Sequence, residues 1–429
     1  MKKNFYFAVK CVAGILLFFG TLSLNAQTIH ISDRAGLEAM SDNDSADYVL
    51  DNDIDLGDSE WTPLYSDGSF RGTLDGQGHK ILNLTITSGE NIGLFYLLDN
   101  GSEVKNLGFS NVNITGSQKA GAIAGLAGSA IITNCFVDSG NITTSGELVG
   151  GLLGLTYGIT VDGCYSNADV TGSAHVGGII GHMNGGVVQN CHVDAVVYAT
   201  NIASGGIVGW PRDIDGVIKN CYAKGKVVAV NGFAGGIAGV ADDPDHNIEI
   251  DDCIAAQDSI LIGTDPGGNR IIGIAGAPSY NVSNNYALDT IPGTWTDDAS
   301  GLDGATITSE QFLDVNFFAD NLPNWDFGTF GDPIWQMTVV GPLLAWEETP
   351  TAVPLTKLNS QAKVYVSNGQ IHIDNAEENA TIRIYSITGV LLQETKASSS
   401  SNVFNVKGFV IIEVESTKNR GTFKVVNFQ

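Results

Sequence analysis

Two short acidic loops contain the side chains of this chain that are best suited to chemistry. They carry Arg212, Asp213 and Asp215 in the first loop, and Asp242, Asp243, Asp245 and His246 in the second. Both loops follow successive copies of a repeated glycine phrase, so we expect them to stack into one patch. Paired carboxylates can cleave glycosidic bonds, and carboxylates with Ca²⁺ and a basic residue can support proton abstraction. The patch is therefore a candidate catalytic or weak calcium site, but Asp, Pro and Gly are also what solvated turns require.

A second candidate cluster consists of three histidines within one repeat, His175, His182 and His192. His192 follows an inward-facing cysteine and should point outward, whereas His182 lies beyond the glycine phrase. We therefore expect that the three rings do not converge. The sequence has no His-Glu-x-x-His, no Gly-x-Ser-x-Gly, no phosphate-cradling loop and no zinc-ligand spacing.

The glycine phrase that precedes the loops is the strongest pattern in the chain. Copies lie at residues 121–125, 150–154, 177–181, 205–209 and 235–239, and residues 93–95 begin another. The first residues of these copies are 28, 29, 27, 28 and 30 positions apart. A fixed period of this size predicts a solenoid of similar coils, in which the glycines allow close approach of neighbouring backbones.

A second phrase follows about ten residues after each glycine phrase and ends in a cysteine. The cysteines are Cys135, Cys164, Cys191, Cys221 and Cys253, each three residues after an apolar residue and directly after Asn, Gly or Asp. A flat strand would put residues three apart on opposite faces, so both can face inward only if the chain turns a corner between them. The same slot holds Leu107 and, by our alignment, Tyr286. We therefore expect a ladder of buried free thiols and neither disulfides nor a metal site.

These patterns predict an all-β protein: a right-handed parallel β-helix (solenoid) followed by a small Ig-like β-sandwich. The strands are rich in Val, Ile and Thr, and the turns in Gly, Asn, Asp and Ser. Residues 70–290 supply about eight coils, which corresponds to a rod of roughly 35–40 Å at the spacing of neighbouring strands.

The remaining segments suggest a domain order. Residues 1–26 have the charged start, apolar stretch and small-residue end of a cleaved signal peptide, and residues 27–69 form an N-terminal cap. Residues 291–349 form a C-terminal cap, whose dense aromatics we expect to close the last coil. Residues 350–356 are a linker, and the alternating short strands of residues 357–429 are the β-sandwich.

The charge narrows the possible partners. The chain has 47 acidic and 21 basic residues, a formal net charge of −26. Nucleic acid, anionic membranes and acidic polysaccharides are therefore poor partners. No stretch beyond the signal peptide approaches membrane length, so we expect an exported protein without a membrane span, and a monomer.

Two segments resemble known families. Trp61-Thr62-Pro63, the glycine phrases and the exit around Trp325-Asp326-Phe327 and Trp346 resemble GLUG-repeat proteins of exported bacterial, often Bacteroidetes, origin. That resemblance implies a β-helical, adhesin-like surface protein and no particular reaction, and some immunoglobulin-cleaving metallopeptidases carry such repeats. Residues 382–390 and 407–414 resemble the C-terminal sorting domain of type IX secretion, which implies contact with the secretion machinery. The Asn-Pro usual near the start of that domain is absent.

Taken together, we interpret the chain as a secreted or cell-surface binding protein that recognises a glycan or protein ligand on its strand face. We favour this over two alternatives, a glycan-cleaving enzyme that uses the acidic loops and a structural spacer. We expect no cofactor other than a possible calcium ion at those loops.

Overall fold

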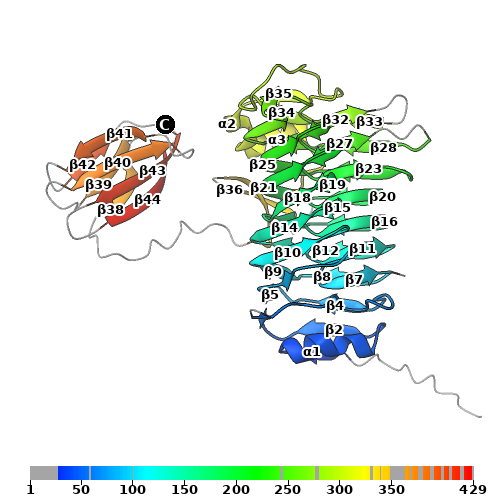
Figure 1. Ribbon diagram of the computed structural model, residues 1–429. Helices are drawn as coiled ribbons and strands as arrows, with labels where there is room; N and C mark the ends of the chain where they lie inside the picture. The colour runs from blue at the N-terminus through cyan, green and yellow to red at the C-terminus, as the bar shows by residue number, and fades with distance from the viewer. Residues whose placement is uncertain are drawn as a thin grey trace, which may run out of the picture.

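Figure 1 shows the computed structural model of the chain. It describes residues 28–347, apart from positions 58, 100, 242–244, 276–279, 329–331 and 339. Beyond these it describes residues 363–367, 370–374, 380–386, 391–397, 401–404, 408–415 and 420–427. The predicted signal peptide (1–26) and linker (350–356) lie outside the described residues, as do Asp242 and Asp243 of the second acidic loop.

The described part of residues 28–307 forms a parallel β-solenoid, which confirms the predicted fold class. One coil runs through β19 (Ala174–Gly177), β20 (Ile180–Gln189) and β21 (His192–Ala199), each in a different sheet. Each strand pairs in parallel with its counterpart one coil away, for example β20 with β16 from Leu153↔Ile180 to Asp162↔Gln189. Figure 1 shows the coils stacked along one axis from the N-terminal cap (blue) to β35 (yellow-green).

Sheet A has 15 strands. They are β1 (Ile29–Ile31), β2 (Asp47–Leu50), β4 (Thr73–Asp75), β7 (Phe95–Leu98), β8 (Glu103–Lys105), β11 (Ala124–Gly128), β12 (Ile131–Thr133), β16 (Leu153–Asp162), β20, β23 (Val208–Pro211), β24 (Gly216–Lys219), β27 (Ala238–Ala241), β28 (Ile248–Asp251), β32 (Ile272–Ala275) and β33 (Tyr280–Ser283). Sheet C has four strands, β15 (Glu147–Gly150), β19, β22 (Ala203–Gly205) and β26 (Phe233–Gly235).

Sheet B has 16 strands, and only its β30–β31 pair is antiparallel among the described pairs. They are β3 (Ile54–Asp55), β5 (Lys80–Leu82), β6 (Thr85–Ile86), β9 (Gly108–Ser110), β10 (Val112–Gly116), β13 (Phe136–Val137), β14 (Gly140–Thr144), β17 (Tyr165–Ser166), β18 (Asp169–Gly172), β21, β25 (Tyr222–Ala229), β29 (Ile254–Ala255), β30 (Ser259–Ile262), β31 (Asp265–Pro266), β34 (Tyr286–Leu288) and β35 (Ala305–Ile307).

The glycine phrases bring neighbouring coils into backbone contact. A Cβ atom placed on Gly178 would lie 2.2 Å from the carbonyl oxygen of Gly206, and one on Gly206 would lie 2.0 Å from that of Gly236. These distances are far shorter than any real Cβ contact, so the positions require glycine because of packing between coils.

The corner predicted from the cysteine phrase is confirmed. The residue before each cysteine has a positive φ, between 51° and 62° at Asn134, Gly163, Asn190, Asn220 and Asp252. Side chains on this corner bond to one another between coils, as when Asn134 Nδ2 donates to Asn106 Oδ1 at 3.2 Å. Asn therefore suits both the left-handed backbone and these side-chain bonds, whereas Gly suits the left-handed backbone alone.

The cysteine position that follows each corner lies in the solenoid interior, which excludes water. All five described cysteines are free and fully buried. Burial raises the pKa of the Cys135, Cys191 and Cys253 thiols well above the usual value. The ladder of buried free thiols is thereby confirmed.

The assignment of Tyr286 to this slot is wrong by one residue. Asn284 is the corner residue, with φ 53°, so Asn285 takes the interior position and is fully buried. Its Oδ1 accepts from the backbone N–H of Cys253 at 2.8 Å, and its Nδ2 donates to Ile250 O at 2.7 Å. A polar side chain is tolerated in the interior because both of its ends are bonded.

The first coil is covered by a helical segment, α1 (Arg34–Glu38) followed by the 3-10 turn η1 (Ala39–Asp42). Asp33 caps α1 by accepting from the N–H of Gly36 at 2.8 Å. Leu37 and Met40 are fully buried, because they face the open end of the solenoid. In Figure 1, α1 lies across that end, where uncovered strand edges would otherwise be exposed.

The predicted C-terminal cap, residues 291–349, has two parts. In the first, β35 pairs with β34 of the last coil, and Leu302 O accepts from the N–H groups of Ile271 and Ile272. The second part is the exit segment, residues 309–347. It contains α2 (Ser309–Phe312), α3 (Val315–Asn321) and the hairpin of β36 (Trp335–Thr338) and β37 (Gly341–Leu344). The segment returns along the side of the solenoid: the ring of Phe317 packs on Tyr286 at 5.4 Å, and that of Trp346 on Tyr165 at 5.8 Å. Aromatics that the sequence suggested would plug the end therefore cover several coils laterally.

The reason is a column of outward-facing rings on sheet B, formed by Phe136, Tyr165, His192 and Tyr222, which stand in register. The ring centroids of His192 lie 5.0 Å from Tyr165 and 4.9 Å from Tyr222, nearly parallel to both. Such apolar rings must be removed from water, and the exit segment does so. We call these four residues the aromatic column.

Residues 363–427 contain two small antiparallel sheets. One is β38 (Lys363–Ser367), β39 (Gln370–Asp374) and β42 (Ser401–Phe404); the other is β40 (Thr381–Ser386), β41 (Leu391–Lys396), β43 (Gly408–Glu415) and β44 (Arg420–Asn427). Side chains from both sheets share one buried cluster, including Ile371, Ile382 and Ile412. The described residues thus form a small sandwich with its own core.

Candidate functional site

The described parts of the two acidic loops lie on neighbouring coils; Asp242 and Asp243 are outside the described residues. Residues 212–215 join β23 to β24, and residues 245–247 precede β28, whose Ile248 is in register with Gly216 of β24. The backbone N–H of Asn247 donates to Asp215 Oδ1 at 2.7 Å. Asp213, Asp215 and Asp245 are exposed, and His246 is half-buried.

Arg212 packs against an aromatic ring at the base of this patch. Its guanidinium carbon lies 4.6 Å from the ring centre of Trp210, and its Nε lies 3.4 Å from Asp213 Oδ1. Asp213 itself has a φ of 66°. These contacts hold the start of the loop in place. Arg212 therefore has a structural role, as expected if the loop is a solvated turn.

The three histidine rings do not converge, as we expected, but two of them meet. The rings of His175 and His182 are 5.5 Å apart, and Trp210 lies 4.0 Å from the first and 5.2 Å from the second. His192 is separate from this pair, in the aromatic column. The turn at the glycine phrase folds β19 back onto β20, and this brings His175 over the position next to His182.

The histidine pair is neutral in the folded protein. Burial lowers the pKa of His175 to about 3, and burial also lowers the pKa of His182. In the amide orientation that satisfies its neighbours, Asn184 Nδ2 lies 2.9 Å from His182 Nε2 and 3.0 Å from Asp213 Oδ2. This network links the pair to the first acidic loop. Among the described residues, no three or more His, Cys, Asp or Glu side chains are grouped so as to hold a metal ion.

Sheet B carries a second polar feature, which we call the polar ladder. It consists of Thr85-Ile86-Thr87, Asn113-Ile114-Thr115, Asn141-Ile142-Thr143 and Asp169-Val170-Thr171, each 28 residues after the one before. Asn113 is paired with Asn141, and Asn141 with Asp169, so these side chains form one row along the solenoid axis. A second row contains Thr115, Thr143 and Thr171.

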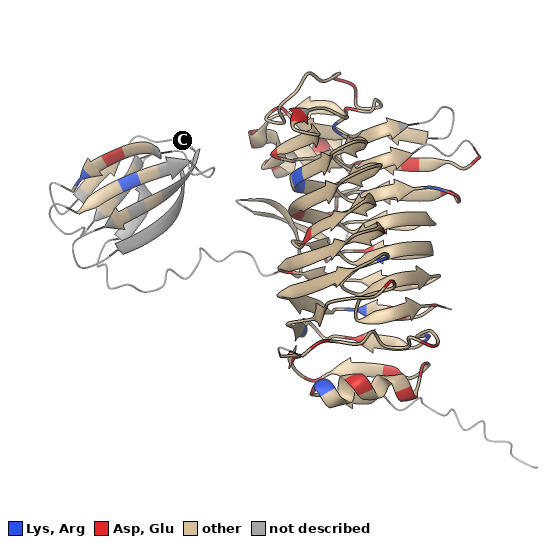
Figure 2. Ribbon diagram, in the orientation of Figure 1, with Lys and Arg blue, Asp and Glu red and all other residues tan. Residues whose placement is uncertain are grey.

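The ladder faces solvent. Asn113, Thr115, Asn141 and Asp169 are exposed, Thr143 and Thr171 are half-buried, and the apolar residues between them are buried. In Figure 2 the broad strand faces are mostly tan, while the red and blue segments gather at the cap and the turns. Asp169 is the single charged member, and one of its oxygens accepts from the N–H of Val196 at 2.8 Å. The row of threonines ends at Tyr198, which takes the position of Thr171 in the next coil.

Comparisons with known proteins place the N-terminal part of the chain near one family. Residues 18–139 match the family model described as the M26 IgA1-specific metallo-endopeptidase N-terminal region. The cap and the first coils are similar to that region. Halomucin from Haloquadratum walsbyi is 32% identical over an alignment of 149 residues that covers 29% of this chain and 2% of halomucin. This chain therefore spans only a small part of that relative.

A solved structure supports the fold. The crystal structure of a candidate immunoglobulin A1 protease from Bacteroides ovatus aligns with a TM-score of 0.52 at 23% identity. The alignment covers 76% of this chain and 94% of that chain. At this identity the likeness concerns the β-solenoid and nothing finer.

Sequence reasoning missed the polar ladder and the histidine pair. The ladder had a signal, because its four tripeptides repeat at a constant spacing of 28 residues. The histidine pair had none of comparable strength, because its two members are separated by a turn whose angle a repeat period does not specify. No helix among the described residues has the length and apolar character to cross a bilayer.

Proposed function

We propose that this protein is an exported, surface-associated binding protein whose polar ladder holds an extended, uncharged glycan. The observation that carries the proposal is the double row of Asn, Thr and Asp side chains, exposed or half-buried on four successive coils. Amide, hydroxyl and carboxylate groups can donate to and accept from sugar hydroxyls at each step. Export agrees with the predicted signal peptide, the GLUG and sorting-domain resemblances, and the likeness to a Bacteroides protein.

A glycan suits this surface better than a protein strand does. The ladder lies within sheet B, where β10, β14 and β18 each have a hydrogen-bonded neighbour on both sides. An added protein strand needs an open sheet edge for its backbone bonds, and this surface offers only side chains. The net charge of −26 also disfavours anionic polymers.

The test is binding of neutral polysaccharides to the protein expressed from residue 27, measured by affinity electrophoresis. Replacing Asn113 and Asn141 together by Ala removes two rungs of the exposed row, and we expect about a 5- to 150-fold loss of affinity, since each lost hydrogen bond costs about 0.5–1.5 kcal/mol. The matched control replaces Thr133 and Thr160, which are half-buried on sheet A, by Ala. Absence of binding to every neutral glycan tested, or equal loss in the control, would reject the proposal.

A further inference from the structure

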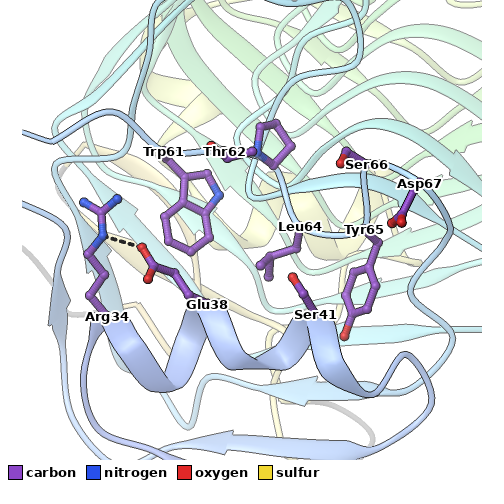
Figure 3. A pocket seen from close by; sticks show the side chains of 10 residues that line it. Arg34, Glu38, Ser41, Trp61, Thr62, Leu64, Tyr65, Ser66 and Asp67 are labelled. Atoms are coloured by element: carbon purple, nitrogen blue, oxygen red, sulfur yellow. Dashed lines mark hydrogen bonds and ion pairs between the residues drawn. The ribbon is translucent and has the colours of Figure 1, made fainter.

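A cavity of about 330 Å³ lies in the N-terminal cap, between the helical segment and residues 61–67 (Figure 3). Its lining residues include Glu38 and Ser41 from one side and Trp61, Tyr65 and Asp67 from the other. This volume is at the lower end of the range for small-molecule sites in proteins. The cavity adjoins the first rung of the polar ladder, since the backbone N–H of Trp61 donates to Thr85 O at 2.7 Å, but the inference does not depend on the function proposed for the ladder.

One wall of the cavity is held by hydrogen bonds within the protein before any ligand binds. Arg34 Nε donates to Glu38 Oε1 at 2.7 Å, as the dashed line in Figure 3 shows. Other guanidinium nitrogens donate to the carbonyl oxygens of Leu56 at 2.8 Å and Glu60 at 2.9 Å. The Glu38 carboxylate is thereby held in place by an arginine that is itself anchored to the backbone. A binding group positioned in this way loses little conformational entropy when a ligand arrives.

The polar atoms of the cavity floor are already bonded within the protein. Trp61 Nε1 donates to Leu94 O at 3.1 Å, and the Tyr65 hydroxyl donates to the backbone oxygen of Asn43 at 3.0 Å. Trp61, Leu64 and Tyr65 are nearly buried, while Ser41, Thr62, Ser66 and Asp67 are exposed or half-buried around them. The cavity thus has a closed floor, whose side chains are only 2–6% exposed, and an exposed rim of hydroxyl and carboxylate groups.

The arrangement of the rim selects the ligand class. The carboxylates of Glu38 and Asp67 disfavour an anion. Figure 3 shows these two side chains on opposite sides of the cavity, so they do not converge on one point as a bound ammonium group would require. Separate acceptors and hydroxyls around the rim match a ligand that carries several hydroxyl groups. We propose that the cap cavity binds a neutral saccharide of one or two rings.

The experiment uses saturation-transfer NMR on the protein expressed from residue 27, with glucose, galactose, mannose, N-acetylglucosamine, lactose and cellobiose as probes, and cadaverine as an amine probe. We expect at least one sugar to bind. Its affinity should fall at least tenfold in Ser41→Trp, which fills the cavity from an exposed position, and in Asp67→Ala, which removes an acceptor. Ala39→Trp is the matched control, since Ala39 is exposed on the same segment but does not line the cavity.

The outcomes separate this site from the polar ladder. Affinity for the small sugar should be unchanged in the Asn113→Ala, Asn141→Ala double variant, and loss of polysaccharide binding in that variant would leave the cavity intact. The proposal is overturned if no sugar binds, if binding survives in both Ser41→Trp and Asp67→Ala, or if cadaverine is the only probe that binds at the cavity.

Discussion

Replacing Gly206 by Ala should lower the free energy of unfolding by about 3 kcal/mol or more. The new Cβ would lie 2.0 Å from the carbonyl oxygen of Gly236, 2.6 Å from the Cβ of Ala223 and 2.8 Å from Gln257 Nε2. The first of these atoms is backbone and belongs to a coil that is hydrogen-bonded on both sides, so it cannot move away cheaply. Chemical denaturation followed by far-ultraviolet circular dichroism measures the loss.

Gly68→Ala is the control for this substitution. A Cβ on Gly68 would meet nothing within 4 Å, and its φ is not in the left-handed region. Stability should therefore change by no more than about 0.5–1 kcal/mol in either direction. Comparable losses in the two variants would show that the glycine phrase is not needed for contact between coils.

Replacing Glu347 by Ala should cost about 2–4 kcal/mol. Glu347 Oε1 accepts from His192 Nε2 and from the backbone N–H of Leu344, both at 2.7 Å. The side chains of His192 and Glu347 are only 4% and 9% exposed, so the two donors would remain buried without their acceptor. We expect the end of the exit segment to loosen from the aromatic column, which would be measured as faster amide hydrogen exchange in β36 and β37.

A double-mutant cycle with His192→Phe tests whether the cost arises from that pair. A phenylalanine resembles the neighbouring rings of the column and needs no acceptor, so Glu347→Ala should cost clearly less in the His192→Phe background. Equal costs in both backgrounds would contradict the assigned role of the contact.

The repeat unit could be predicted because every coil must meet the same physical requirement. The interval of three between an apolar residue and a cysteine demands a corner, and Asn or Gly at that corner fits a left-handed backbone. One assignment within the repeats was wrong: Tyr286 was placed at the interior position that Asn285 occupies. This position lies in an outer coil, where no cysteine identifies it. Periodicity therefore determines the interior well and loses accuracy at the ends.

What surrounds the solenoid could not be predicted in the same way. The position after each of the first four repeat cysteines is Phe136, Tyr165, His192 or Tyr222. Outward rings at that place imply a cover, but the period does not say which segment supplies it. The exit segment does so by contacts between residues more than a hundred positions apart, such as the Tyr222 hydroxyl donating to Pro342 O at 2.6 Å. The histidine pair depends on a turn angle in the same manner, whereas the acidic loops could be placed because they repeat.

The most direct test of the stacked coils is alkylation of the thiols with iodoacetamide in the protein expressed from residue 27. The number of labels is counted by mass spectrometry. Because Cys135, Cys164, Cys191, Cys221 and Cys253 are fully buried and free, the folded protein should take up no label, and the protein unfolded in denaturant should take up one label on each of them. Rapid labelling of the folded protein, or missing label after unfolding because disulfides are present, would contradict the stacking of the coils around a dry interior.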